Sequence, residues 1–184
     1  MRKVSREEIV DYQTYGDRRE ETRTAVMAIK RPRRIHVGEV LTFLFENADT
    51  IRYQIQEILR AERIARESDI LAEIDTYNSM LGEDGELGCC LLIEIDDKQE
   101  REERLRLWVD LPQHLYLRCA DGTRIRPIVG SGQADEGKIS SVQYLKFPVG
   151  ERIPVAVGSD LPALTVETVL DSEQQQALLA DLKS

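Results

Sequence analysis

Polar side chains recur at intervals of four and three residues in the first half of the chain, a spacing that places them on one face of a helix. This polar stripe consists of Glu46, Thr50, Tyr53, Glu57 and Arg60. In a cleft, Glu57 could act as a general base and Arg60 as an anion clamp. The same groups could instead form a buried hydrogen-bond network or ion pairs on a solvated helix surface. The stripe therefore predicts a structural network, a partner-binding surface or the wall of a ligand site.

Other polar residues should lie beside the stripe or face it from a second helix. The candidate binding residues are Glu46, Tyr53, Gln54, Glu57, Arg60, Arg63, Glu73, Tyr77 and Asn78. In the small-ligand or enzyme interpretation, a polar cleft forms around Glu57, Arg60 and Glu73, and either Glu57 or Glu73 is the base.

A basic patch precedes the stripe, although the whole chain is acidic. Its candidate anion-binding or partner-binding residues are Arg31, Arg33 and Arg34. Residues 1–66 carry 14 basic against 11 acidic residues, whereas the chain has 25 against 34 and a formal net charge of −9. We expect these arginines to pair with the acidic second half or to contact a protein partner. Nucleic acid is disfavoured because no aromatic residue interleaves the patch.

Residues typical of known catalytic and metal sites are missing from the sequence. Nucleotide-binding glycine loops and hydrolase nucleophile motifs do not occur. The two histidines, His36 and His114, lack the Glu-x-x-His spacing of a di-iron centre, and a site using His36 with Glu39 is short of ligands. We therefore assign no catalytic residue, metal or cofactor.

The three cysteines, Cys89, Cys90 and Cys119, form no C-x-x-C motif and lie in apolar, strand-like segments. Free cysteine in such segments usually behaves as a small buried hydrophobe. Because neighbours on a strand point to opposite faces, only Cys119 could approach Cys89 or Cys90 in a redox pair. Reduced, buried thiols are the simpler interpretation.

The segments before residue 82 have the periodicity of helices. A short helix is expected near Arg6–Tyr12, and a second helix at Asp17–Lys30. A long helix is predicted over Gly38–Ala65, because apolar residues repeat by four and three from Val37 to Ile58. A second helix at Ile70–Leu81 should complete an antiparallel αα-hairpin that turns near Arg66–Ser68.

After Gly82 the pattern changes to that of strands, with turn residues between them. We predict that Asp96–Arg104 is a solvated hairpin tip and that Gly130, Gly132 and Gly137 belong to a loop. The chain should end in a helix through Leu182, with Ser172 and Gln175 as its capping box. The expected strands are Leu87–Ile95, Leu105–Leu111, Leu115–Cys119, Arg124–Val129, Ser141–Val149, Arg152–Val157 and Leu164–Val169.

Together these elements predict an α+β fold. Residues 1–82 would form a helical region containing the αα-hairpin, packed on residues 83–184 as an antiparallel β-barrel or sandwich with a short C-terminal helix. The two regions should make one compact unit. Neither a membrane-spanning apolar run nor a signal peptide is recognisable, so we expect a cytoplasmic protein. Apolar surface left exposed on the long helix would favour a homodimer.

Four segments carry a resemblance to a known family: RRIHVGE, FENADTIRYQIQEILRAERI, EIDTYN and VQYLKF. They resemble a bacterial family of uncharacterised proteins, domain of unknown function family 3501, over nearly the whole chain. The resemblance implies a redox or oxidative-stress setting, because members are often encoded beside rubrerythrin-like and iron–sulfur oxidoreductase proteins. We accordingly expect an accessory protein that binds an oxidoreductase partner. The family pattern emphasises Glu46, Asn47, Tyr53, Gln54, Glu57, Arg60, Glu62, Arg63, Glu73, Tyr77, Asn78 and Gln143.

Overall fold

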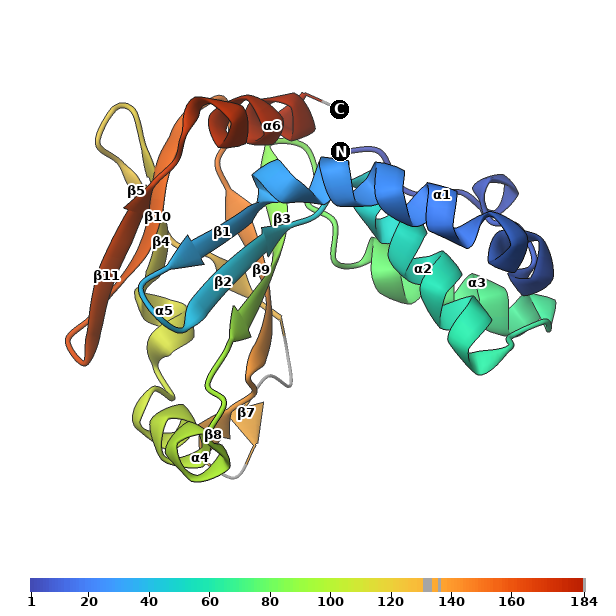
Figure 1. The fold of residues 1–184 in the computed structure, drawn as a ribbon. Helices are drawn as coiled ribbons and strands as arrows, with labels where there is room; N and C mark the ends of the chain where they lie inside the picture. Colours follow the sequence, from blue (N-terminus) through green and yellow to red (C-terminus); the bar gives the residue numbers. More distant parts are fainter. Residues whose placement is uncertain (131–133, 136, 184) are drawn as a thin grey trace.

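A β-sandwich and a helical arm that projects from its side make up the molecule (Figure 1). The structure, a computed structural model, describes residues 1–130, 134–135 and 137–183. The prediction of an α+β fold with antiparallel sheets is confirmed, and of its two alternatives the structure shows a sandwich. Within the described residues, no helix is both long enough and apolar enough to cross a membrane.

The helical arm is built from three helices and the chain that precedes them. It contains η1 (Arg6–Glu8), α1 (Tyr12–Lys30), α2 (Ala48–Glu62) and α3 (Glu67–Asn78). The helices outside the arm are η2 (Arg31–Arg33), α4 (Lys98–Leu107), α5 (Leu111–His114) and α6 (Ser172–Leu182). The predicted αα-hairpin is confirmed as α2 and α3, with its turn between residues 62 and 67.

All strand pairs among the described residues are antiparallel. The first sheet has, in spatial order, β1 (Arg34–Val37), β2 (Leu41–Phe45), β3 (Glu86–Ile93), β9 (Val142–Pro148) and β6 (Ile128–Val129). The second sheet has β11 (Leu164–Val169), β10 (Pro154–Leu161), β4 (Leu115–Cys119) and β5 (Arg124–Ile125). A separate ribbon pairs β7 (Ala134–Asp135) with β8 (Lys138–Ile139).

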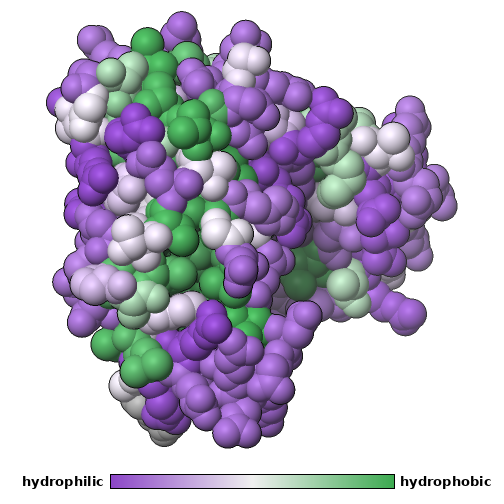
Figure 2. Space-filling model, turned by 60° about the vertical axis from the view of Figure 1, so that its left-hand side comes forward, coloured by the Kyte–Doolittle hydropathy of each residue, from purple (hydrophilic) through white to green (hydrophobic). Residues whose placement is uncertain are grey.

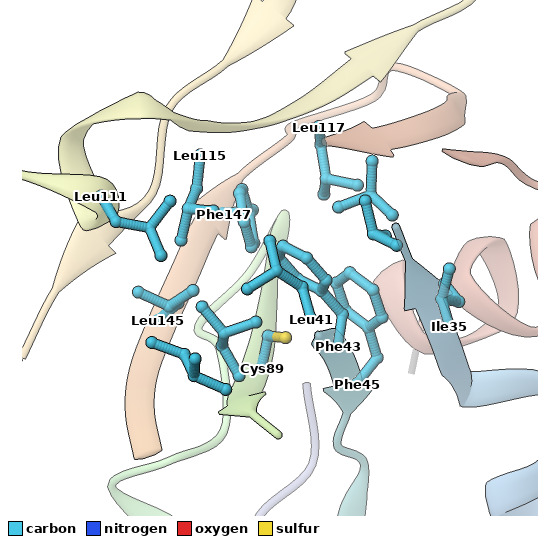
Figure 3. Close-up of a cluster of buried hydrophobic side chains, with 14 of the residues drawn as sticks. Ile35, Leu41, Phe43, Phe45, Cys89, Leu111, Leu115, Leu117, Leu145 and Phe147 are labelled. Atoms are coloured by element: carbon cyan, nitrogen blue, oxygen red, sulfur yellow. The ribbon is translucent and has the colours of Figure 1, made fainter. Parts of the chain in front are cut away.

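The main hydrophobic core lies between the two sheets, where alternate residues of each strand point inward. Phe43, Phe45 and Phe147 come from the first sheet, and Leu115 and Leu117 face them from the second (Figure 3). Burying each such side chain contributes about 1.5–3 kcal/mol. A space-filling view shows apolar surface among polar residues on the sandwich, whereas the arm is mostly hydrophilic (Figure 2).

A second core holds the arm together. Ile51, Ile55 and Leu59 of α2 pack with Ile70 and Ile74 of α3 and with the N-terminal segment. Two side-chain amides fix that segment, each bonding both backbone groups of one residue. The Asn78 amide pairs with Val4 in this way at 2.9 Å for both bonds. The Gln56 amide pairs with Val10 at 2.9 and 3.0 Å.

The prediction of one helix over Gly38–Ala65 is wrong for its first part. Residues 34–45 form the β1–β2 hairpin, which turns through Gly38 at a φ of +62°, and α2 begins only at Ala48. Asn47 caps α2 by accepting a hydrogen bond from the Thr50 N–H at 3.0 Å. The predicted helical region therefore contains two strands that belong to the first sheet.

The predicted strand Leu105–Leu111 and the predicted hairpin tip Asp96–Arg104 are also wrong. Helix α4 occupies most of the predicted tip and the first three residues of the predicted strand, and α5 begins at Leu111. Asp97 caps α4 by accepting a hydrogen bond from the Glu100 N–H at 2.7 Å. Leu105, Trp108 and Leu111 are buried, whereas Leu107 is 75% exposed. A step of three residues between buried side chains follows a helical turn rather than a strand.

Most of the remaining predictions are confirmed with shifted ends. Strands form at all six of the other predicted positions, but the predicted strand Arg124–Val129 divides into β5 and β6, which belong to different sheets. The last helix ends at Leu182 as predicted, but Asp171 and Gln174 form its capping box instead of Ser172 and Gln175. Gly122 turns between β4 and β5 at a φ of +84°. Near the N-terminus, only a 3₁₀ turn forms at Arg6–Glu8, and α1 starts at Tyr12 instead of Asp17. The loop prediction at Gly132 lies outside the described residues.

Candidate functional site

Glu57, at the centre of the polar stripe, is bound by side chains of α1. The Arg19 guanidinium donates two hydrogen bonds of 2.8 Å to its carboxylate, and the Tyr15 hydroxyl donates a third of 2.7 Å. The bonds from Arg19, followed by the one from Tyr15, lower the pKa of Glu57, although partial burial opposes them. A carboxylate held in this way is a weak base. This part of the stripe joins α1 to α2.

Glu46 lies just before α2 and is almost completely buried, with 4% of its surface exposed. One carboxyl oxygen accepts a hydrogen bond from Gln54 at 2.8 Å, while the other has no hydrogen-bond partner among the described residues. Burial raises the pKa of Glu46, and the positive charge of Lys30 partly opposes that shift. Lys30 in turn lies 5.3 Å from the centre of the Tyr53 ring.

The structure distributes the other candidate residues over different surroundings. Arg60 lies 3.9 Å from Glu57, and its buried Nε has no hydrogen-bond partner among the described residues. Arg63 is exposed at the end of α2, with a φ of +54°. Glu73 and Tyr77 are half-buried on α3, and burial, followed by the charge of Glu73, raises the pKa of Tyr77. Tyr53 and Asn78 are buried.

The basic patch consists of arginines that pair with acidic residues far along the chain. Arg33 makes a buried pair with Asp181 through bonds of 2.7 and 2.8 Å. Arg31 reaches Glu173 at 2.7 Å, and Arg34 lies 3.4 Å from Glu94. These contacts correspond to the predicted pairing with the second half of the chain.

The thiols and His36 have partners or surroundings that fit structural roles. All three cysteines are free; Cys89 and Cys119 are buried, and Cys90 is half-buried on the opposite face of β3. Burial, followed by the charge of Glu46, raises the pKa of Cys90 to about 12. His36 Nδ1 lies 2.8 Å from the Thr42 hydroxyl on the neighbouring strand. Within the described residues, no group of three or more metal-ligating side chains gathers.

A pocket of about 490 Å³ opens where the end of α3 meets the edge of the first sheet. We call it the junction cleft. Two smaller pockets, of about 250 and 370 Å³, lie within the arm. Glu57, Arg60 and Glu73 line none of these three pockets. The residues that line the junction cleft are Thr76, Ser79, Met80, Ile128, Val129, Gly130, Tyr144, Leu145 and Lys146.

The junction cleft has mainly apolar walls, and several of its side chains are exposed to solvent. Ile128 is 55% exposed, and Val129 and Tyr144 are exposed as well. Lys146 contributes the only ammonium group of the lining, and it makes no ion pair with the described residues. Apolar walls with one charged group are typical of binding sites. Strand β6 forms the edge of the sheet beside the cleft and consists of two residues.

Sequence reasoning identified the αα-hairpin but missed the residues that line the cleft. Tyr77 and Gln143 were singled out, whereas their chain neighbours Thr76 and Tyr144 line the pocket. Tyr144 alternates with the inward residues Gln143 and Leu145, so the strand prediction could have placed it on the outer face. No signal in the sequence indicated that α3 would end against β6.

The arrangement defines a class of α+β protein in which a helical arm is attached to an antiparallel β-sandwich. The chain belongs to DUF3501, a family described as proteins of unknown function, which matches residues 3–182. A crystal structure of a protein of unknown function from Burkholderia pseudomallei is similar over 98% of this chain and 100% of that chain. The two are 27% identical, with a TM-score of 0.90. The curated proteins contain no match.

The buried carboxyl of Glu46 leads to a testable pH dependence. Because its pKa is raised in the folded protein, the native state binds more protons than the unfolded state at pH values above about 4.5, and stability falls as the pH rises through that range. Glu46→Gln should therefore have a higher free energy of unfolding than the wild type at pH 7, with a difference that shrinks toward pH 4.5. Urea unfolding at several pH values measures this difference, and an equal or lower stability at pH 7 would contradict the assignment.

Proposed function

We propose that this protein is a cytoplasmic accessory protein that binds an extended segment of a partner protein in the junction cleft. The observation that carries the proposal is an apolar cleft beside the two-residue edge strand β6, with exposed Ile128 and Val129 in its wall. A peptide can add to such an edge through backbone hydrogen bonds while its side chains enter the neighbouring pocket. The unpaired ammonium of Lys146 favours a segment with a carboxylate among its apolar residues.

The family resemblance supports an oxidoreductase as that partner. A rubrerythrin-like protein and an iron–sulfur oxidoreductase encoded by the same genome are therefore the first two partners to test. In this proposal the redox centre belongs to the partner, and the present chain supplies the apolar walls of the cleft and the positive charge.

The test compares two substitutions of exposed strand valines. Val129→Lys places a charge in the apolar wall of the cleft, whereas Val169→Lys makes the same change on β11, where the side chain is 66% exposed. We expect Val129→Lys to weaken partner binding at least tenfold in calorimetric titration, and Val169→Lys to leave it unchanged. Equal binding by both variants would exclude the cleft as the contact surface, and no binding of either oxidoreductase by the wild type would exclude these partners.

A small-molecule ligand is the second candidate, because the volume of the cleft is within the range of about 300–1,000 Å³ typical of ligand sites. The polar cleft expected around Glu57, Arg60 and Glu73 is less favoured, since Glu57 is tied to α1. Ligand screening by thermal shift separates the two candidates, because a small ligand should stabilise the wild type more than Val129→Lys.

A further inference from the structure

A charged cluster on the outer face of the second sheet lies apart from the junction cleft and does not depend on the proposed function. It is built on β4, β5, β10 and β11 and on the residues at their ends. We call it the arginine cluster; its members are His114, Tyr116, Arg118, Arg124, Arg126, Asp160 and Glu167.

Tyr116 forms the platform of the cluster. It pairs with Gly158 of β10, and its hydroxyl reaches across that strand to donate a 3.0 Å hydrogen bond to Glu167 of β11. A Cβ atom at Gly158 would lie only 3.0 Å from the Tyr116 oxygen and 2.3 Å from the Val166 carbonyl oxygen. The missing side chain of Gly158 therefore gives the phenol room to lie flat across the sheet.

Two guanidinium groups cover the Tyr116 ring, which is 3% exposed although it lies on an outer face. Arg124 is 4.3 Å from the ring centre and Arg126 is 5.7 Å away, distances at which a cation is attracted to an aromatic face. Stacking restricts the long Arg124 side chain in advance, so less conformational entropy is lost when it binds a ligand.

The two carboxylates of the cluster are already occupied. Arg126 donates two hydrogen bonds to Asp160, at 3.1 and 2.5 Å, and His114 Nδ1 lies 3.0 Å from the same carboxylate. The bonds from Arg126, followed by the one from His114, lower the pKa of Asp160 to about 2. Arg118 binds Glu167 in the same two-pronged way, at 3.0 and 2.8 Å.

Arg124 has the fewest hydrogen bonds of the three guanidinium groups in the cluster. Its one hydrogen bond to the described residues is a long one of 3.4 Å to Asp160. A guanidinium carries five N–H donors in a fixed fork, so most of those of Arg124 are free. Three arginines face two carboxylates in the cluster, which leaves an excess of one positive charge on a protein whose net charge is −9. The local charge and the free donors both favour an anion.

We infer that the arginine cluster is a binding site for an oxyanion, a phosphate or carboxylate group of a small molecule, with Arg124 as the group that contacts it. The guanidinium fork matches two oxygens of either anion. Tyr116 and Gly158 act as positioning residues, because they set the plane of Arg124 without contacting the ligand. Arg118 binds Glu167 and Arg126 binds Asp160, so both carboxylates have closer partners than Arg124. Most donors of Arg124 therefore stay available to a ligand.

The test is a titration of the whole protein with inorganic phosphate and, separately, with acetate, at constant ionic strength. Binding is followed by calorimetry and by the amide NMR signals of the β4–β5 hairpin, including those of Thr123 and Ile125. We expect saturable shifts of these signals, and the anion with the higher affinity identifies phosphate or carboxylate as the natural group. Arg124→Gln should lower that affinity at least tenfold.

The matched control is Arg66→Gln, which removes the same charge from an exposed position in the arm. It should leave the affinity within twofold of the wild type. The inference is overturned if neither anion produces saturable shifts in the hairpin, or if Arg124→Gln binds as tightly as Arg66→Gln does. If the chemical shifts of residues remote from the hairpin are the same in Arg124→Gln as in the wild type, the variant keeps the fold.

Discussion

Asp181→Ala is expected to lower the free energy of unfolding by about 3–5 kcal/mol, the cost of leaving one member of a buried ion pair without its partner. Arg33 and Asp181 are 10% and 5% exposed at their side chains. Arg33 also donates a 2.7 Å hydrogen bond to the carbonyl of Ile29, and Asn47 donates to Asp181 at 3.2 Å. The pair therefore connects α6 with the end of α1 and the start of α2.

Glu173→Ala is the matched control, because it removes a carboxylate from the same helix. Its partner Arg31 and Glu173 itself are largely exposed, and exposed ion pairs contribute little to stability. Urea unfolding at pH 7 compares the two variants. Losses of similar size in both would show that the Arg33–Asp181 pair is as solvated as the surface pair.

Gly88→Ala is expected to cost about 3 kcal/mol, because the added methyl group meets backbone atoms that cannot rotate away. A Cβ atom at Gly88 would lie 2.2 Å from the Met80 carbonyl oxygen and 3.0 Å from the Gly82 nitrogen. Either β3 or the segment after α3 must then shift. Since Met80 also lines the junction cleft, partner binding should weaken in the same variant.

Gly16→Ala provides the opposite control. Gly16 lies inside α1, and a Cβ atom there has nothing within 4 Å. Alanine in a helix interior is favoured over glycine by about 0.5–1 kcal/mol, so this variant should be more stable than the wild type. Thermal unfolding of both variants measures the difference. An unchanged midpoint for Gly88→Ala would mean that the chain around Met80 adjusts without cost.

The sequence predicted the fold class and most strands because alternation and turn residues act locally. The error at Gly38–Ala65 arose because apolar residues at steps of four and three continue by coincidence from β1 through α2. Leu41, Phe43 and Phe45 also alternate, and all three are buried in the sandwich. Periodicity alone cannot decide between these patterns, whereas the Asn47 cap and the β-favouring residues before it mark the true boundary.

The candidate residues were harder to interpret, since their roles depend on contacts between distant segments. The spacing from Glu46 to Arg60 correctly placed several polar groups on one side of α2, but it could not show that α1 would cover Glu57. The junction cleft combines α3 with β6 and β9. Both strands follow the end of α3 by about 50 or more residues in the chain. Such a meeting of elements follows from tertiary packing, which local patterns do not encode.

The position of the β1–β2 hairpin between α1 and α2 has a consequence for how the protein folds. The chain passes between arm and sandwich three times, after α1, after β2 and after α3. Neither part is therefore a continuous stretch of sequence, and the sheet must join β3 to the distant β9 before it is complete. Closing such large loops costs entropy before the contacts form, so folding should be slow and cooperative, with arm and sandwich appearing in the same kinetic phase.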